Sequence, residues 1–231
     1  MRKITIAIDG YSSTGKSTVA RDLADYLKYI YVDTGAMYRA VTLYALRKGI
    51  AKDEQLDKDA LIAALPEIQV AFNYDHDSGS SEVLLNGERV GKQIRTLEVS
   101  DYVSPVAAIP EVRKKLVAIQ HAMGKEGGIV MDGRDIGTVV FPNAELKIFM
   151  TAEASERAKR RYLELKSRGD EISYEEVYEN VTERDQIDTT RKDSPLVKAA
   201  DAIEIDNTET NQEDQFHIIL QLAKDRIAGR V

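Results

Sequence analysis

Apolar residues follow two different patterns along this chain. Residues 4–8, 129–131 and 146–150 are short runs rich in Ile, Val, Leu, Phe and Met, which is typical of strands buried on both faces of a parallel sheet. Residues 16–27 instead place an apolar side chain at every fourth position, which predicts a helix. Alternation of such strands and helices predicts an α/β fold with a mostly parallel sheet flanked by helices.

The same patterns extend to both ends of the chain. Residues 29–32 and 202–205 are β-prone, and an amphipathic helix over 216–227 follows the last of them. After residue 32 we expect another helix, with Thr34 as its N-cap and Gly49 just past its end. The strands predicted at 4–8, 29–32 and 202–205 are therefore each followed by a helix.

The pattern changes in the middle of the chain. A helix over 53–65 is expected to stop at Pro66, and alternating apolar and polar residues follow, which predicts short strands. Asn86-Gly87 separates two of these strands and is a strong signal for a type I′ hairpin turn. We predict a small inserted antiparallel β subdomain over about 66–100, with residues 75–81 as its exposed tip.

Two helices are expected after this insert. The first, over 97–108, contains Pro105, which we expect to break it because proline lacks a backbone N–H. The second begins at Pro110 and ends at Gly124, the arrangement that helix termini favour.

Residues 152–191 are rich in charge. A helix over 152–166 is basic, and a capping box of Ser173 and Glu176 begins a second helix beyond a glycine-containing bend. We interpret these as two basic helices that form a lid over about 155–191 and close on phosphates. The alternative is a solvated surface hairpin held by internal ion pairs.

The composition is that of a water-soluble enzyme-sized domain. The chain has 231 residues, which suits one domain with a core of 1–65, 101–154 and 192–231 in addition to the insert and the lid. It contains no cysteine, so disulfides and thiolate metal sites are excluded, which fits a reducing compartment. The apolar run before Asp9 is too short for a signal peptide or a membrane span. We expect a soluble, cytoplasmic, monomeric protein that binds no membrane.

The formal net charge of −7 argues against a general nucleic-acid binder, since such proteins present a basic surface to phosphates. A polyanionic ligand would need a local basic cluster. We therefore expect no nucleic-acid partner.

Residues 10–18, GYSSTGKST, contain the pattern G-x-x-x-x-G-K-[ST] between a predicted strand and a predicted helix. Gly10 and Gly15 let backbone N–H groups wrap phosphate oxygens, Lys16 reaches the terminal phosphates of a nucleotide, and Ser17 would hold Mg²⁺. The helix also directs its positive N-terminal end at the anion. The alternative is a glycine-rich turn that binds nothing.

Asp132 follows the apolar run 129–131 directly. An aspartate at the carboxyl end of a buried strand, beside a phosphate loop, orients Mg²⁺ or its waters. The alternative is an aspartate that caps a helix or stabilises a turn. Thr34 and Arg39 follow another strand and are candidates for a second anion, because ligands bind at the carboxyl ends of parallel strands. A solvated Arg39 is the alternative.

The chain resembles the bacterial cytidylate kinases of the nucleoside monophosphate kinase group along essentially its whole length. The motifs that carry this resemblance are GYSSTGKST at 10–18, DTGAMYR at 33–39, SPVAAIPEVR at 104–113, DGRDIGTVVFP at 132–142 and RDQIDTTR at 184–191. The insert is similar to one in the same place in these kinases. Tyr11 departs from the proline common there, and Gln186 and Ile187 occupy variable positions.

The resemblance implies a P-loop fold and transfer of the γ-phosphoryl group of ATP to CMP, and to dCMP, with Mg²⁺. ATP would be held by the whole loop, Gly10, Tyr11, Ser12, Ser13, Thr14, Gly15, Lys16, Ser17 and Thr18. The acceptor would be bound by Thr34, Arg39 and Arg134 at its phosphate, by Ser104, Arg113 and Asp135 at cytosine, and by Arg184, Asp188 and Arg191 near the ribose. Catalysis would rest on Lys16, Arg134, Arg157 and Arg161, and the metal would be held by Ser17 and Asp132.

Two other functions remain open at this stage. One is a P-loop kinase for another small acceptor, such as shikimate or dephospho-coenzyme A, which would lack the cytosine-reading residues and the insert. The other is a non-catalytic nucleotide-dependent switch. Arginines available for a second anion argue against a switch.

Overall fold

A computed structural model describes residues 2–74 and 81–230. The chain forms two compact units, Met1–Tyr31 with Glu126–Val231, and Val32–Lys125. The predicted tip at 75–81 lies outside the described residues, apart from Ser81. The predicted boundaries of core, insert and lid stay predictions, whereas the α/β fold with its mostly parallel sheet is confirmed.

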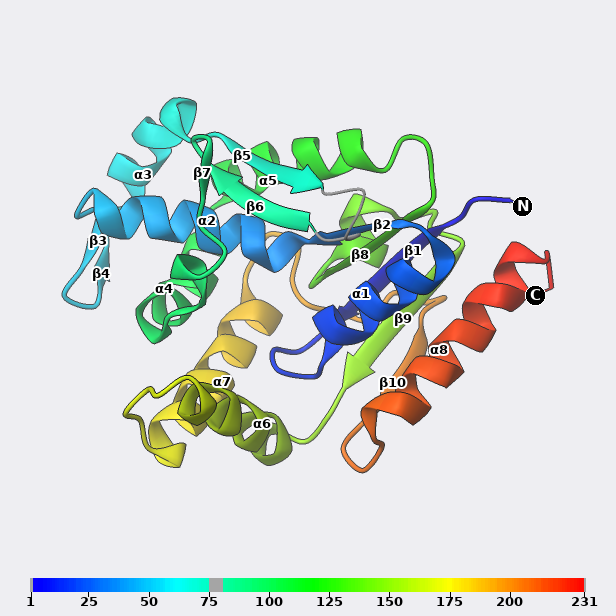
Figure 1. The fold of residues 1–231 in the computed structure, drawn as a ribbon. Coiled ribbons are helices and arrows are strands. Elements are labelled where there is room, and N and C mark those ends of the chain that lie inside the picture. The colour runs from blue at the N-terminus through cyan, green and yellow to red at the C-terminus, as the bar shows by residue number, and fades with distance from the viewer. Residues whose placement is uncertain (1, 75–80, 231) are drawn as a thin grey trace. The chain divides into compact units, whose positions relative to one another are not determined.

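A five-stranded sheet forms the centre of the first unit (Figure 1). Its strands are β1 Thr5–Gly10, β2 Ile30–Asp33, β8 Ile129–Gly133, β9 Leu146–Thr151 and β10 Ile203–Asp206. They lie in the order β10-β9-β1-β8-β2, and β2 leads into the second unit. The pairs β1·β8, β1·β9 and β9·β10 are parallel, so the carboxyl ends of these strands share one edge of the sheet.

Two of the helices of this unit cover one face of the sheet. The helices are α1 Lys16–Leu27, α6 Ala154–Ser167, α7 Tyr174–Thr190 and α8 Gln212–Ile227. Ile6 and Ile8 of β1 lie on the same side of the strand and pack in one buried cluster with Leu23 of α1 and Ile219 of α8 (Figure 1). No helix among the described residues is long and apolar enough to cross a membrane.

The second unit packs around one long helix. Its elements are α2 Thr34–Arg47, β3 Ala51–Lys52, β4 Gln55–Leu56, α3 Lys58–Ala64, β5 Val70–Tyr74, β6 Ser81–Leu85, β7 Glu88–Arg89, α4 Leu97–Ala107 and α5 Pro110–Met123. The strands β5, β6 and β7 form the predicted antiparallel sheet. Met37 and Val41 of α2 lie in one core with Leu85 of β6, Val103 of α4 and Leu116 of α5.

The helix predicted over 53–65 is wrong in its first five residues. Residues 51–56 form the β3·β4 hairpin, in which Asp53 and Glu54 have φ angles of 50° and 61°. Positive φ at both central residues is the geometry of a type I′ turn, which fits the twist of a hairpin. Helix α3 begins only after Asp57, whose carboxylate accepts a hydrogen bond from Ala60 N.

Two local predictions near helix ends also need correction. Asp33 rather than Thr34 caps α2, since its Oδ1 accepts a 2.8 Å hydrogen bond from Ala36 N. Pro105 does not break α4, which continues to Ala107. The proline lies in the last turn, where Val103 and Val106 are buried in the core of the second unit and hold the helix in place.

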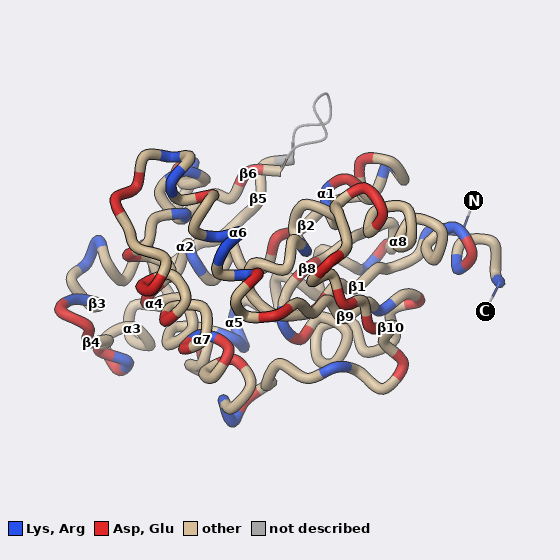
Figure 2. Tube along the Cα trace, turned by 90° about the horizontal axis from the view of Figure 1, so that it is seen from below, with Lys and Arg blue, Asp and Glu red and all other residues tan. Residues whose placement is uncertain are grey.

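The hairpin α6–α7 is not a pair of basic helices. Lys and Arg predominate in α6, but Glu and Asp predominate in α7 (Figure 2). The expected capping box of Ser173 and Glu176 does begin α7. Opposite charges on the two helices form ion pairs such as Arg157–Asp185, at 2.6 Å. The hairpin thus carries the internal ion pairs of the alternative interpretation, and its closure as a lid stays a prediction.

The packing of α5 makes a first prediction. Leu116 is fully buried, so Leu116→Ala should lower the free energy of unfolding of the second unit by about 2–5 kcal/mol through lost burial and a residual cavity. Urea unfolding followed by circular dichroism measures the change. Lys114→Ala, an exposed change on the same helix, should stay within about 0.5 kcal/mol of the parent. Equal effects of the two variants would contradict this core.

Candidate active site

The loop after β1 has the backbone geometry that its glycines predict. Gly10 has a φ of 142°, and a Cβ there would lie 1.9 Å from the carbonyl oxygen of Met150 on β9. Only glycine permits this approach of the two strands. Gly15, with a φ of 86°, directly precedes α1, and its carbonyl accepts from Thr18 N at 3.1 Å. The loop therefore ends where the positive end of α1 begins.

Lys16 lies against the loop that it belongs to. Its Nζ donates to the backbone oxygen of Tyr11 and, at 3.3 Å, to Thr14 Oγ1, and only 5% of the residue is exposed. Burial lowers the pKa of Lys16 well below its ordinary value, and the nearby charge of Arg134 lowers it further, against the opposite effect of Asp132. A bound phosphate would supply the negative charge that favours the ammonium form.

Ser17 and Asp132 lie side by side, as the sequence predicts for a metal site. Ser17 Oγ donates to Asp132 Oδ2 at 2.9 Å, and Tyr31 OH donates to Oδ1 at 2.8 Å. A hydroxyl and a carboxylate next to a phosphate loop suit Mg²⁺, which prefers oxygen ligands and keeps several waters. Among the described residues, no group of three or more His, Cys, Asp or Glu side chains could hold a metal. The donors present therefore fit Mg²⁺ bound jointly with nucleotide phosphates.

Asp9 is a residue that the sequence analysis missed. Its two carboxylate oxygens each accept a 2.7 Å hydrogen bond, from Ile136 N and Gly137 N, at the start of a π-helical turn, Ile136–Val140. A Cβ on Gly137 would lie 3.3 Å from Asp9 Oδ2, so the glycine permits the close approach. Asp9 thus fixes the turn that follows Arg134 and Asp135. Its only sign in the sequence is a carboxylate directly after the apolar run 4–8, before the first glycine of the loop.

Arg134, Asp135, Asp188 and Arg191 form one network in the first unit. Arg134 Nε donates to Asp188 Oδ2 at 2.8 Å. Arg191 lies 3.8 Å from Asp188 and 4.0 Å from Asp135. Burial would raise the pKa of Asp188, but Arg134 and Arg184 hold it below its ordinary value. Burial would lower the pKa of Arg134, but the Asp188 carboxylate raises it above its ordinary value.

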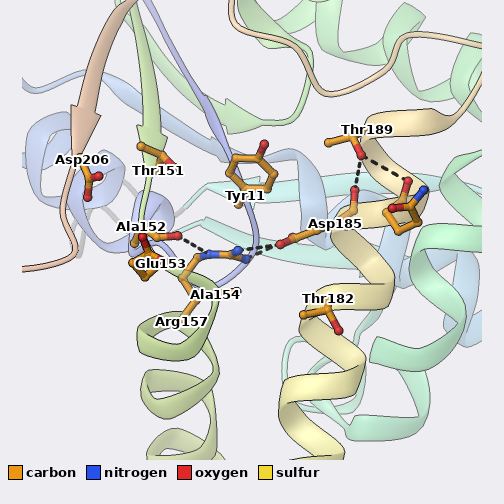
Figure 3. A pocket seen from close by; sticks show the side chains of 11 residues that line it. Tyr11, Thr151, Ala152, Glu153, Ala154, Arg157, Thr182, Asp185, Thr189 and Asp206 are labelled. Atoms are coloured by element: carbon orange, nitrogen blue, oxygen red, sulfur yellow. Dashed lines mark hydrogen bonds and ion pairs between the residues drawn. The ribbon is translucent and has the colours of Figure 1, made fainter.

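The two arginines predicted for the lid, Arg157 and Arg161, differ in their surroundings. Arg157 is 4% exposed and lies near Tyr11 of the phosphate loop (Figure 3). Its Nη1 donates to the backbone oxygen of Ser12 at 3.4 Å. Arg161 instead pairs with Glu164 along its own helix, at 2.9 Å. The structure therefore brings Arg157 to the loop, whereas the ion pair of Arg161 points along α6.

The remaining predicted residues lie in the second unit. Arg39 pairs with Asp33 at 2.9 Å and its Nε is buried without a hydrogen bond, while Thr34 is the buried first residue of α2. Burial would raise the pKa of Asp33, but Arg39 holds it below its ordinary value. Ser104 and Arg113 are also buried, and the Arg113 guanidinium donates to Ala107 O at 3.2 Å.

Comparisons with known proteins agree on one family. The family model described as cytidylate kinase matches residues 6–225. A cytidylate kinase of Flavobacterium johnsoniae is 61% identical over 97% of this chain and 98% of its own length. A cytidylate kinase of Flavobacterium psychrophilum is 59% identical over 97% of this chain and 100% of its own length. One of Phocaeicola vulgatus is 57% identical over 93% of this chain and 94% of its own length.

The environment of Asp9 predicts a pH effect on stability. Burial raises the pKa of Asp9 from 3.8 to about 7, although the hydrogen bonds from Gly137 and Ile136 oppose the rise. The native state then binds this proton more tightly than the unfolded chain does, so the contribution is complete below about pH 4 and is lost as the pH rises through 7.

Asp9→Asn removes this titration and keeps one acceptor oxygen. As the pH rises from about 4 to about 7, the midpoint temperature of thermal unfolding of the parent should therefore decrease relative to that of Asp9→Asn. Unfolding curves of both proteins across this range measure the difference. Parallel pH profiles would mean that Asp9 keeps an ordinary pKa.

Proposed function

Because the chain belongs to the cytidylate kinase family, we infer that it transfers the γ-phosphoryl group of ATP to CMP, which gives ADP and CDP. The observation that best supports this function is the phosphate loop with buried Lys16 at its end and Arg134 close enough to affect the lysine's pKa. Positive groups arranged in this way suit a reaction in which negative charge has to be neutralised. We extend the acceptor to dCMP.

We propose that residues 10–18 bind the phosphates of ATP and that Ser17 and Asp132 would hold Mg²⁺. The metal supplies charge neutralisation of the phosphates when bound. Lys16 and Arg157 stabilise negative charge on the transferred group, and Arg161 joins them when the lid closes. The 2.9 Å hydrogen bond of Ser17 to Asp132 supports the metal role, since it shows that these two oxygen ligands lie side by side.

For the acceptor, we propose that Arg39 and Arg134 bind the phosphate of CMP and that Thr34 assists Arg39. Cytosine would be read by Ser104, Arg113 and Asp135, and the ribose by Arg184, Asp188 and Arg191. No protein base is needed, because the attacking oxygen belongs to a phosphate that is already an anion. Catalysis is then a matter of in-line positioning and charge stabilisation.

A coupled assay with ATP and each of CMP, dCMP, UMP, AMP and GMP tests this proposal. We expect CMP and dCMP to be phosphorylated most efficiently. Turnover of another nucleotide in preference to CMP would assign a different acceptor. ATP binding without transfer to any of them would favour a switch.

Lys16→Ala should lower kcat by orders of magnitude, because the ammonium group is needed where negative charge develops in the transition state. Steady-state kinetics with ATP and CMP measures the change, and circular dichroism reports whether the fold is kept. Lys125→Ala removes the same charge from an exposed site and should leave kcat unchanged. Near-normal turnover of a folded Lys16→Ala variant would contradict the phosphate-loop role.

Asp135→Asn tests how the base is chosen. Cytosine presents an amine that needs an acceptor, whereas uracil presents a carbonyl, and the substituted amide can donate to that carbonyl. We expect kcat/KM for CMP to fall about 10- to 100-fold, since an unpaired buried polar group costs about 1–3 kcal/mol. The preference over UMP should narrow or reverse. Equal losses with both substrates would instead mean that Asp135 orients Arg134 or Arg191.

A further inference from the structure

A cavity of about 450 Å³ opens beside the phosphate loop in the first unit (Figure 3). Tyr11 of the loop, Arg157 of α6 and Asp185 and Thr189 of α7 line it, and Asp206 lies at the end of β10. The close-up shows the Arg157 guanidinium between Ala152 and Asp185, with the Tyr11 ring nearby. Residues far apart in the sequence therefore meet at one cation.

The contacts of Arg157 account for its fixed position. Its Nε donates to Ala152 O at 2.8 Å, and Nη1 reaches Ser12 O of the loop. Asp185 accepts from both terminal nitrogens, Nη1 at 3.1 Å and Nη2 at 2.6 Å. Such a two-point pair fixes the plane of a guanidinium as well as its place. Asp185 is thus the only carboxylate partner that the structure records for Arg157 among the residues it describes.

Tyr11 supplies a further contact to this guanidinium. The Arg157 Cζ lies 5.0 Å from the centre of the Tyr11 ring, within the range of a cation–π interaction. The ring is itself held by Phe149 of β9, with ring centres 6.1 Å apart and planes at 80°. The proline that is common at this position in the cytidylate kinases offers no aromatic face. The cation–π contact therefore depends on the tyrosine that this chain has at position 11.

We propose that Asp185 and Tyr11 are positioning residues that hold the Arg157 guanidinium beside the phosphate loop for the phosphates of the donor nucleotide. This inference rests on the proposed function, in which ATP binds at residues 10–18. The guanidinium is planar and presents its donors in a fixed fork, so small rotations misdirect it. Asp185 sets the plane of the fork, and the Tyr11 ring supports its face.

Loss of either positioning residue should affect the use of ATP, the phosphoryl donor, and not the binding of CMP. Without Asp185, the arginine keeps its charge but loses the partner that fixes its plane. Without the ring, it loses support on one face. Either loss should weaken ATP binding and lower kcat, while the KM for CMP stays close to that of the parent.

Steady-state kinetics of Asp185→Asn, Asp185→Glu, Tyr11→Leu and Tyr11→Phe, together with ATP binding by calorimetry in the absence of CMP, tests the proposal. We expect kcat/KM for ATP to fall on the order of tenfold in Asp185→Asn and Tyr11→Leu, as measured for other contacting pairs. Tyr11→Phe keeps the ring and should lose clearly less than Tyr11→Leu, and Asp185→Glu should recover part of the loss of Asp185→Asn. The double variant Tyr11→Leu/Asp185→Asn should lose less than the product of the single losses.

Glu88→Gln is the matched control. It also removes a carboxylate charge from a two-point pair with an arginine, Arg47, but in the second unit and at the surface. Its kinetic constants should be those of the parent.

Other outcomes would overturn the proposal. Lower thermal stability with unchanged kcat, KM and ATP affinity would make the pair purely structural. An equal rise in the KM values for ATP and CMP would mean that Asp185 acts through α7 on acceptor residues, and equal losses in Tyr11→Phe and Tyr11→Leu would exclude the ring contact. If the parent bound ATP but phosphorylated no CMP, the proposed function would fail, while the ATP affinities of the variants would still decide this inference.

Discussion

The central place of β1 in the parallel sheet constrains everything around the phosphate loop. β1 is hydrogen-bonded to β8 on one side and β9 on the other, so its carboxyl end cannot move without both neighbours. The last two residues of β1, Asp9 and Gly10, need different side chains. Gly10 must be small because the Met150 carbonyl approaches it, and Asp9 must be a carboxylate because two N–H groups converge on it. The loop and the turn after Arg134 are thus positioned by one strand.

This register explains why groups distant in sequence share one edge of the sheet. Ile8 pairs with Asp132 and Asp9 with Gly133. This parallel pairing places the Asp132 carboxylate beside the start of the phosphate loop, where it accepts a hydrogen bond from Ser17. Ligands bind at this edge in α/β sheets because the strands end there and the helices begin. At the end of β1 the helix that begins after the loop is α1, whose N-terminal end adds positive potential without a further side chain.

The sequence predicts those parts of the protein that depend on local pattern. The strand, loop and helix over 4–27, the Asn86-Gly87 turn and the capping box at Ser173 each follow from residues close together in the chain, and the structure contains all of them. The β3·β4 hairpin was missed because Leu56 was assigned to the same apolar helix face as Leu61 and Leu65. Asp53 is a residue type that tolerates positive φ, but Glu54 is not, so the pair gives no strong turn signal.

The side-chain partners were harder to predict for a different reason. The contact of Asp9 with the turn at Ile136 spans 127 residues, and that of Tyr31 with Asp132 spans 101, so no spacing rule reaches them. Both depend on which strands become neighbours in the sheet. Likewise, the pairing of Arg157 with Asp185 requires α6 and α7 to pack together, which charge content alone did not show.

These pairings also explain how an acidic chain, with a net charge of −7, can bind polyanions. Removing a cation from water is costly, and an unpaired buried guanidinium would destabilise the fold. In the first unit the cost is offset in advance, because Asp188 accompanies Arg134 and Asp185 accompanies Arg157. A phosphate that reaches either arginine meets a cation that is already desolvated and oriented, so binding adds or exchanges an anion instead of stripping water from a free side chain. If phosphates bind where we propose, the two carboxylates hold these arginines in place before a phosphate arrives.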